Sequence, residues 1–516
     1  MEKPILSIDC GTQRLRVLLF SEKGELLDRT QIKYEPYYSE RPGWAEKNPD
    51  VYWQSLCDGC RELKERNSQL FENIAGVGVT TQRATMINLD SKGDVLRPAI
   101  IWLDQRSAEP NYKPYPPMKM IYKIVGMDEA IEKTQRDGKC NWIMQNQPEI
   151  WAATHKYLQV SGFINFRLTG EFKDSIASQI GHIPFNYKKM EWGKGRQLPN
   201  LFFPVEKEKL PDLVGPGEQL GKISKGACLE TGIPEGTPVI ACGSDKGCET
   251  IGMGVVDQTM ASLSFGTTAT VQTTTAKYFE TLAFLPPYPA PIPGHYNPEV
   301  EILRGYWMIT WFKNEFAHKE VQEAESKGVA PEEMLNNLLK QSPPGSMGLV
   351  VQPYWSPGLK EPSAKGAMIG FGDVHTRAHV YRAVIEGLAF GLLEGLHKME
   401  KKGKQKVNKL AVSGGASQSD EICQISADIF NLPLVRGKTW ETSGLGAAIV
   451  TAAGLGVYPS VGAAIKNMVG YKKIFEPDRK NAKIYQELFE RVYKNIYKAL
   501  CPLYKEIRDI TGYPEK

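Results

Sequence analysis

Asp9, Thr12 and two nearby arginines form a short polar group of a kind that binds a metal-bound phosphate. They lie in or beside the turn between two apolar, β-prone runs of Ile5–Phe20, a pattern that predicts a hairpin. Backbone N–H groups in a Gly-containing turn suit phosphate oxygens, and a carboxylate beside them suits Mg²⁺, which prefers oxygen ligands. The arginines are Arg14 and Arg16. A surface hairpin with a polar turn is the alternative interpretation, because the D-x-G-T pattern is short.

A second stretch repeats this pattern about half a chain later. Residues Ala261–Gln272 run from a β-prone segment into Gly266-Thr267-Thr268 and out into another β-prone segment. Two hairpins of the phosphate-binding kind predict two similar lobes that grip one nucleotide between them.

Three further polar groups follow predicted strands. Thr81-Gln82-Arg83 follows the apolar run 74–80, Asp104-Gln105-Arg106 follows 99–103, and Gly243-Ser244-Asp245 follows 239–242. In open α/β sheets ligands bind beyond the carboxyl ends of the strands, so these side chains are candidate substrate contacts. The structural alternatives are helix capping for Asp245 and packing or ion pairing for Arg83 and for Trp102, which lies just before Asp104.

A glycine-rich turn in the second half joins the predicted strand Lys409–Ser413 to the predicted helix Glu421–Phe430. Such a turn brings backbone close to a flat or anionic ligand. Other predicted helices are Asp50–Arg66, Trp307–Phe316, Ala378–Met399 and Gly444–Gly456, the last rich in small residues and therefore able to pack closely. The proline-rich residues 286–294 predict an extended loop, and Trp440-Glu441 is near a loop that could face a nucleotide.

The 516 residues are too many for a single core and predict two domains, with a boundary near residue 255. A net charge of +4 without a dense basic block argues against nucleic acid as a partner. The sequence has no uninterrupted run of about 18 apolar residues, so we expect no membrane-spanning helix. The nine scattered cysteines do not predict a disulfide framework and favour a reducing cytoplasm. The lone pair Cys57 and Cys60 lacks the second pair that a zinc site requires.

Taken together, these motifs resemble the FGGY carbohydrate kinases, the group that includes glycerol kinase and xylulokinase. The matching residues extend over nearly the whole chain: Asp9-Cys10-Gly11-Thr12 with Arg16, Pro42-Gly43-Trp44 with Glu46, Gln82-Arg83, Trp102 with Asp104 and Arg106, Leu168-Thr169-Gly170, Gly243-Ser244-Asp245, Gly266-Thr267-Thr268, Arg382 with Glu386-Gly387, Gly414-Gly415-Ala416, and Ala427-Asp428. The resemblance implies an α/β fold of two actin-like, ribonuclease-H-like domains with a cleft between them. Residues 1–254 would form the sugar-binding N-terminal domain and residues 255–516 the nucleotide-binding C-terminal domain.

The resemblance also implies ATP-dependent transfer of the γ-phosphoryl group to a hydroxyl of a sugar, polyol or sugar acid, with Mg²⁺. Asp245 matches the catalytic base, and Asp9 and Asp245 match the carboxylates at the metal. The positions that match substrate contacts are Gln82, Arg83, Trp102 and Asp245. The positions that match nucleotide contacts are Thr12, Arg16, Gly266, Thr267, Thr268, Gly414, Gly415, Ala416 and Ser419.

Two positions depart from the family pattern. Ala84 stands where glycerol-type members have a glutamate, which argues against glycerol as the substrate. Lys246 stands where the family often has Gln or Asn; a cation there favours an ionised Asp245 or meets a negative group of the substrate. We therefore expect Arg83, Arg106 and Lys246 to leave room for an acidic or larger polyhydroxy substrate.

A different class of function is a non-catalytic actin-like protein that binds ATP to change shape, or a degenerate kinase that senses sugar. The presence of both Asp9 and Asp245, together with Trp102 and Gln82-Arg83, favours a kinase. The sequence leaves open which sugar is phosphorylated and whether the chain forms a homodimer.

Overall fold

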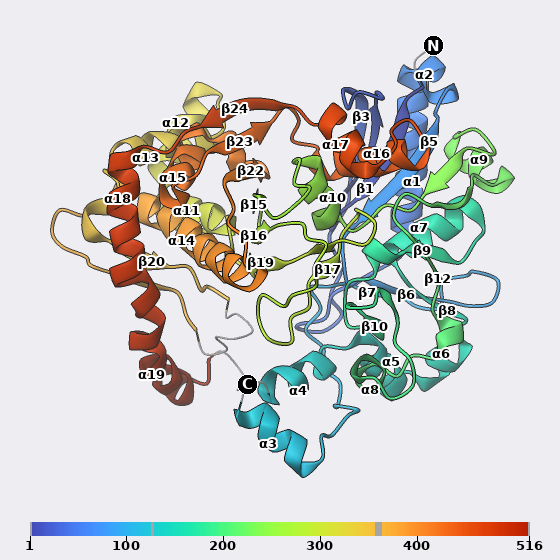
Figure 1. The fold of residues 1–516 in the computed structure, drawn as a ribbon, viewed down its shortest axis with the longest axis horizontal. Helices are drawn as coiled ribbons and strands as arrows, with labels where there is room; N and C mark the ends of the chain where they lie inside the picture. The colour runs from blue at the N-terminus through green and yellow to red at the C-terminus, as the bar shows by residue number, and fades with distance from the viewer. Residues whose placement is uncertain (1–2, 125–127, 357–363, 514–516) are drawn as a thin grey trace. The chain divides into compact units, whose positions relative to one another are not determined.

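The computed structural model describes residues 3–124, 128–356 and 364–513 (Figure 1). The chain divides into two compact units. The first unit comprises Met1–Val256, Pro287–Asn297 and Glu441–Val469; the second comprises Asp257–Pro286, Pro298–Trp440 and Gly470–Lys516. The first crossing, after Val256, lies close to the expected boundary, but two later segments return to the first unit. Each compact unit therefore consists of three separate segments of the chain, whereas the expected ranges 1–254 and 255–516 are continuous.

A six-stranded sheet with the order β13-β14-β5-β1-β2-β3 forms the centre of the first unit. β1 pairs antiparallel with β2 and parallel with β5, and β5 pairs parallel with β14. The carboxyl ends of β1, β5 and β14 therefore meet at one edge of the sheet. The strands are β1 (Ile5–Cys10), β2 (Arg14–Phe20), β3 (Leu26–Lys33), β5 (Gly76–Thr81), β13 (Gln219–Lys222) and β14 (Pro238–Ile240).

Helices cover both faces of this sheet. Leu6 and Ile8 of β1 pack into the core with α1 (Asp50–Arg66) and α7 (Val160–Thr169). Because side chains alternate along a strand, Ser7 and Asp9 point to the opposite face. That face is covered by α16 (Thr442–Gly454), which packs on β1 and β5 and against α10 (Asp245–Gly252). The return of α16 to the first unit is what covers this face.

A four-stranded sheet and several short elements complete the first unit. The strand that we predicted at 99–103 comprises only Ala99–Ile100 in the structure, because a turn at Ile101–Asp104 ends it after Ile100. The sheet, in the order β4-β7-β6-β8, consists of β4 (Glu46–Lys47), β7 (Ala99–Ile100), β6 (Met86–Leu89) and β8 (Lys156–Gln159). The remaining elements are α2 (Ser68–Glu72), α3 (Pro116–Ile124), α4 (Asp128–Arg136), α5 (Lys139–Asn146), α6 (Pro148–Ala153), β9 (Lys173–Ser175), β10 (Phe185–Asn186), β11 (Glu191–Trp192), α8 (Leu198–Phe202), β12 (Asp212–Val214), α9 (Lys225–Thr231), β17 (Tyr288–Pro289), β18 (Tyr296–Asn297) and α17 (Val461–Met468).

The second unit contains a six-stranded sheet with the order β19-β16-β15-β22-β23-β24. From β19 to β24 its neighbouring strands pair antiparallel, antiparallel, parallel, parallel and antiparallel. The first sheet has the same sequence of pairings when it is followed from β3 to β13. The repeated hairpin is thus part of a repeated sheet. The strands are β15 (Met260–Phe265), β16 (Ala269–Gln272), β19 (Glu299–Ile302), β22 (Lys409–Ser413), β23 (Leu434–Gly437) and β24 (Tyr471–Phe475).

The long helix α14 (Arg377–Gly403) passes through the core of the second unit and is buried over most of its length. The other elements are α11 (Trp307–Phe316), α12 (His318–Lys327), α13 (Pro331–Lys340), β20 (Val350–Gln352), β21 (Ala367–Ile369), α15 (Asp420–Phe430), α18 (Arg479–Leu488) and α19 (Lys494–Thr511). Among the described residues, no helix is both long and apolar enough to cross a membrane. All nine cysteines are free.

Candidate active site

Asp9 and Asp245 lie at the shared edge of the first unit's sheet. Asp9 of β1 pairs with Thr80 of β5, and Thr81 forms an isolated parallel bridge with Ser244. Asp245 is the next residue and begins α10, where the Ser244 side chain caps the helix by accepting from the Gly247 amide. The two carboxylates are close enough that the charge of Asp245 raises the pKa of Asp9.

Burial governs the titration of Asp9, which is 4% exposed. Burial raises the pKa of Asp9 to about 6, and the charge of Arg16 opposes this rise. Arg16 Nη1 lies 3.1 Å from Asp9 Oδ2, as expected from the register that sets Arg16 directly opposite Asp9. Asp9 is therefore mostly ionised at neutral pH.

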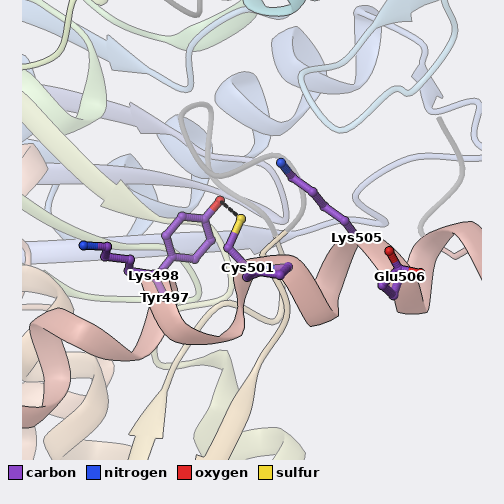
Figure 2. A pocket seen from close by; sticks show the side chains of 6 residues that line it. Tyr497, Lys498, Cys501, Lys505 and Glu506 are labelled. Carbon is purple, nitrogen blue, oxygen red and sulfur yellow. Dashed lines mark hydrogen bonds between the residues drawn. The ribbon is translucent and has the colours of Figure 1, made fainter.

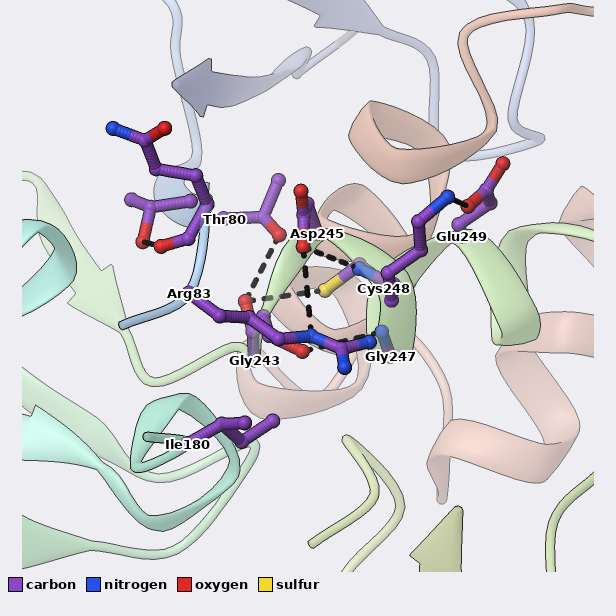
Figure 3. A network of polar contacts seen from close by, with 12 residues as sticks. Thr80, Arg83, Ile180, Gly243, Asp245, Gly247, Cys248 and Glu249 are labelled. Carbon is purple, nitrogen blue, oxygen red and sulfur yellow. Dashed lines mark hydrogen bonds and ion pairs between the residues drawn. The ribbon is translucent and has the colours of Figure 1, made fainter. Parts of the chain in front are cut away.

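Asp245 is half-buried beside a guanidinium (Figure 3). Its Oδ1 accepts a hydrogen bond from the Lys246 amide at 2.7 Å and lies 3.8 Å from Arg83 Nε. Burial raises the pKa of Asp245, while the charges of Arg83 and Lys246 lower it. The ammonium of Lys246 pairs with Glu249 Oε2 at 2.9 Å. Lys246 thus already has a carboxylate partner.

The loop that carries Asp245 is held from two sides. Thr80 Oγ1 donates to the Gly243 carbonyl at 2.9 Å. A Cβ on Gly243 would lie 2.8 Å from the Pro291 ring, so this position requires a glycine. Pro291 belongs to the proline-rich segment, which also sets the Tyr288 ring 5.0 Å from the Arg83 guanidinium. The predicted extended loop is therefore part of this site.

Thr12, Gln82 and Trp102 form a hydrogen-bonded chain. The Thr12 hydroxyl donates to Gln82 Oε1 at 2.7 Å and accepts from Trp102 Nε1 at 2.9 Å. Gln82 is buried, and its amide nitrogen donates to the Tyr52 hydroxyl at 2.8 Å. Trp102 keeps 41% of its surface exposed. Gln82 is thus placed to orient Thr12 and Trp102, whereas Trp102 offers an open ring face.

Arg106 lies in a buried ion-pair cluster, so our expectation that it helps to receive the substrate is wrong. Its guanidinium forms 2.8 Å ion pairs with Glu46 and Asp104. It also lies 4.0 Å from the Trp44 ring centre and 4.6 Å from that of Trp142. With a side chain only 1% exposed, Arg106 is structural.

In the second unit, the turn Gly266-Thr267-Thr268 connects β15 and β16 as predicted. The Gly266 carbonyl accepts from the Tyr306 amide at 3.0 Å, and Thr268 Oγ1 donates to the Leu303 carbonyl at 3.1 Å. Thr267 is exposed. Among the described residues its hydroxyl has no protein hydrogen-bond partner, so it is available to a ligand.

The turn Gly414–Ser419 is braced from several directions. Gly414 has φ +86°, and a Cβ there would lie 2.7 Å from the Phe265 backbone, whereas Gly415 faces open space. Arg436 Nη1 donates to the carbonyls of Ser417 and Gln418 at 3.0 and 3.1 Å. Ser419 Oγ caps α15 and donates to Asn336 Oδ1 at 2.6 Å. The Ser419 side chain is therefore committed to protein partners, unlike the backbone around Gly415.

Two family models together match most of this chain. The N-terminal domain of the FGGY family of carbohydrate kinases matches residues 4–252, and its C-terminal domain matches residues 261–455. The chain belongs to the FGGY family of carbohydrate kinases. It is accordingly a phosphotransferase with an alcohol group as acceptor.

Relatives of this FGGY kinase span its whole length. A protein of Escherichia coli K12 named uncharacterized sugar kinase YgcE is 31% identical over 499 residues, which cover 96% of this chain and 94% of that protein. A xylulose kinase of Lactococcus lactis is 26% identical over 500 residues, with 96% of each chain covered. The crystal structure of a gluconate kinase from Lactobacillus acidophilus superposes with a TM-score of 0.79 at 24% identity, covering 100% of this chain and 99% of that chain. The FGGY kinase therefore has the two-domain actin-like fold.

Two side chains near the candidate site make contacts that the sequence does not reveal. Glu441 binds Arg16 and Arg29, and Tyr288 contacts Arg83. Glu441 is 425 positions from Arg16 in the chain, so no local spacing relates the two. The sequence indicated only that Trp440-Glu441 is near a loop that could face a nucleotide.

An open hollow of about 600 Å³ lies on α19 in the second unit (Figure 2). Its lining residues are Tyr497, Lys498, Cys501, Pro502, Lys505 and Glu506. None of the predicted site residues is among them. Nor does the described part of the chain contain a group of three or more His, Cys, Asp or Glu that could hold a metal ion.

Proposed function

We propose that this kinase transfers the γ-phosphoryl group of ATP to a hydroxyl of a neutral, open-chain sugar or polyol larger than glycerol. The observation that carries the proposal is that Asp9 and Asp245 lie on either side of β5 at the carboxyl ends of one sheet's strands, with Arg83 3.8 Å from Asp245. Phosphoryl transfer depends mainly on alignment and charge neutralisation.

Asp245 would accept the proton of the acceptor hydroxyl. A positioned carboxylate in this role typically accelerates a reaction by about 10²- to 10⁴-fold. Burial raises the pKa of Asp245 and makes it a stronger base, while Arg83 and the Lys246 amide keep it oriented. The start of α10 favours the ionised form that the reaction requires.

Asp9 and Asp245 have the donor atoms that Mg²⁺ prefers. Mg²⁺ is usually bound by one or two carboxylates together with water and substrate phosphates. In the described structure, Asp9 Oδ2 pairs with Arg16 and Asp245 Oδ1 accepts from Lys246, so each carboxylate keeps an oxygen without a protein partner. The two residues would hold Mg²⁺, which would neutralise charge on the transferred phosphate.

Each unit, taken by itself, offers groups suited to contact a nucleotide: the glycine turns of the second unit and the β1–β2 turn of the first. Thr267 has an available hydroxyl, and the backbone at Gly415 faces open space. In the first unit, the backbone amide of Thr12 and the guanidinium of Arg16 would contact phosphate oxygens. We assign the adenosine part to Gly414, Gly415 and Ala416, with Ser419 holding that turn through Asn336.

A neutral acceptor suits the charges near Asp245. Arg106 is buried in ion pairs and Lys246 pairs with Glu249, so two of the three cations considered for an acidic substrate are already neutralised. Arg83 is itself balanced by Asp245. Ala84 adds no hydrogen-bond acceptor, which disfavours glycerol and leaves space for a longer chain. The exposed ring of Trp102 can pack against such a chain.

A substrate panel tests this proposal through ADP release with Mg²⁺ and ATP. The panel contains D-xylulose, other ketoses, pentitols and hexitols, glycerol and D-gluconate. We expect kcat/KM to be highest for a neutral compound of five or six carbons, with glycerol and gluconate at least about tenfold lower, the effect of roughly 1.4 kcal/mol of barrier.

Each outcome has a separate meaning. Turnover of gluconate alone would contradict the neutral acceptor but leave the kinase chemistry intact. Absence of ADP release with any compound, in folded protein that binds ATP, would contradict the proposed transfer.

We also propose the cytoplasm as the compartment, because the nine cysteines remain free thiols.

A further inference from the structure

Glu441 is an almost fully buried carboxylate that binds two arginines of the first unit. It is 2% exposed. Its Oε2 lies 2.7 Å from Arg16 Nη1, and its Oε1 lies 2.5 Å from Arg29 Nη1. A buried carboxylate is costly unless it is paired, and both of its oxygens are paired here.

The elements around Glu441 explain why it meets Arg16. Glu441 is the N-cap residue of α16, and the first turn of that helix lies on the same sheet face as Asp9. Ser7, two residues before Asp9, donates to the Gly444 carbonyl at 2.8 Å. Arg16 is directly opposite Asp9 and therefore projects from this face as well. A carboxylate at a helix N-terminus is favoured by the helix dipole.

Arg16 is held at only one of its nitrogens. Its ion pairs with Asp9 and with Glu441 both use Nη1. Among the described residues, Nε and Nη2 have no protein partner, and 26% of the side chain is exposed. The guanidinium is thus fixed on one side and keeps further donors for an anion. A planar guanidinium held in this way suits bidentate binding of phosphate.

We propose that Glu441 is a positioning residue that orients Arg16 toward a nucleotide phosphate. This inference depends on the proposed function, which assigns Arg16 to the phosphates. Glu441 shares Arg16 Nη1 with Asp9, so it keeps the guanidinium from being drawn wholly to Asp9. The other charged groups that face Arg16 or Glu441 are Glu249, whose charge acts on Arg16, and Arg29. Removing the charge at position 441 leaves Asp9 as the carboxylate in direct contact with Arg16.

The test compares binding of ATP with binding of adenosine, by calorimetry in the presence of Mg²⁺. Glu441→Gln keeps the size of the side chain and removes its charge. We expect this variant to bind ATP about tenfold more weakly, the size expected when one charge-assisted contact is lost, and to bind adenosine as the wild type does. In turnover, the KM for ATP should rise while the KM for the sugar stays constant.

Two further variants separate positioning from mere support of the fold. Arg29→Met removes another partner of Glu441 and leaves its pair with Arg16 in place, so ATP affinity should stay at the wild-type value. Glu441→Asp keeps the charge on a shorter side chain and should restore part of the ATP affinity. If Glu441→Gln does not fold, Glu441→Asp remains the test, because its shorter reach should still weaken ATP more than adenosine.

The possible results are distinguishable. Equal losses for ATP and adenosine, or unchanged affinity for both in a folded Glu441→Gln variant, would overturn the positioning role and leave the kinase proposal untouched. A wild-type protein that does not bind ATP would overturn the proposed function and this inference with it. ATP binding without turnover of any sugar would contradict only the proposed acceptor chemistry.

Discussion

At the scale of single residues, the site depends on how each charge is paired. Asp9 and Arg16 could be related from sequence, because a short turn in a hairpin fixes which residues face each other. Arg106 could not be understood in this way, since its partners include Trp142 and Glu46, which come from distant parts of the chain. The group formed by Trp102, Asp104 and Arg106 therefore contains both a candidate substrate contact, Trp102, and a structural residue, Arg106.

Replacing Arg106 with methionine should destabilise the protein without changing its substrate preference. The change leaves Glu46 and Asp104 buried with fewer partners, which costs about 3–5 kcal/mol. Urea unfolding measures the loss. Arg61→Met is the matched control, because Arg61 pairs with Asp58 on the surface and should change stability little. An Arg106→Met variant with normal stability and an altered ranking of acidic and neutral sugars would contradict the structural role.

His182 should make stability depend on pH. Burial lowers the pKa of His182 to about 4, from 6.5 in the unfolded chain, with Asp137 opposing this effect and Lys139 and Lys133 adding to it. As pH falls below 6.5, the unfolded state gains a proton that the folded state does not, so the free energy of unfolding decreases. The decrease is roughly 3 kcal/mol at most by pH 4. The difference between wild type and His182→Gln, followed by urea unfolding from pH 7 to 4.5, should show it; parallel curves would exclude it.

At the scale of elements, hydrophobic periodicity predicted several boundaries to the residue. The predicted helices Asp50–Arg66 and Trp307–Phe316 match α1 and α11, and the predicted strand Lys409–Ser413 matches β22. The first residue of a helix was harder to predict where the helix begins with polar residues. Helix α10 begins at Asp245, within the polar group Gly243-Ser244-Asp245, because Ser244 caps it. That α16 packs on the first unit's sheet could be learned only from the structure.

Close packing between α10 and α16 should be necessary for activity. A Cβ on Gly446 would meet the backbone carbonyl of Cys248, so Gly446→Ala must push the helices apart. We expect a loss of roughly 1–3 kcal/mol of stability, as for other overpacked sites, and a lower kcat, because α10 carries Asp245. Thermal unfolding and steady-state kinetics measure the two effects.

The control for this change is Gly462→Ala on α17. A Cβ at Gly462 would meet only Ser460 Oγ, at 3.9 Å, so this variant should be neutral or slightly stabilised. If Gly446→Ala behaved like Gly462→Ala, close packing of the two helices would not be required.

At the scale of the whole molecule, the chain repeats one sheet plan in two units. Sequence reasoning found the repeat through its hairpins, since Gly11 and Gly266 mark both turns. It did not find that Pro287–Asn297 and Glu441–Val469 return to the first unit. Those returns supply Tyr288, Pro291 and Glu441 to the site, and they depend on long-range packing that local pattern does not encode. The family resemblance, in contrast, extended over the whole chain and was confirmed.

The central claim is that Asp245 acts as the base in phosphoryl transfer from ATP to a sugar hydroxyl. The most direct measurement follows label from γ-labelled ATP into sugar phosphate in a single turnover, with wild-type protein and Asp245→Asn, on the best substrate of the panel. We predict transfer by the wild type and a rate about 10²- to 10⁴-fold lower in the variant, with ATP still bound. Transfer by folded Asp245→Asn at the wild-type rate would contradict the account.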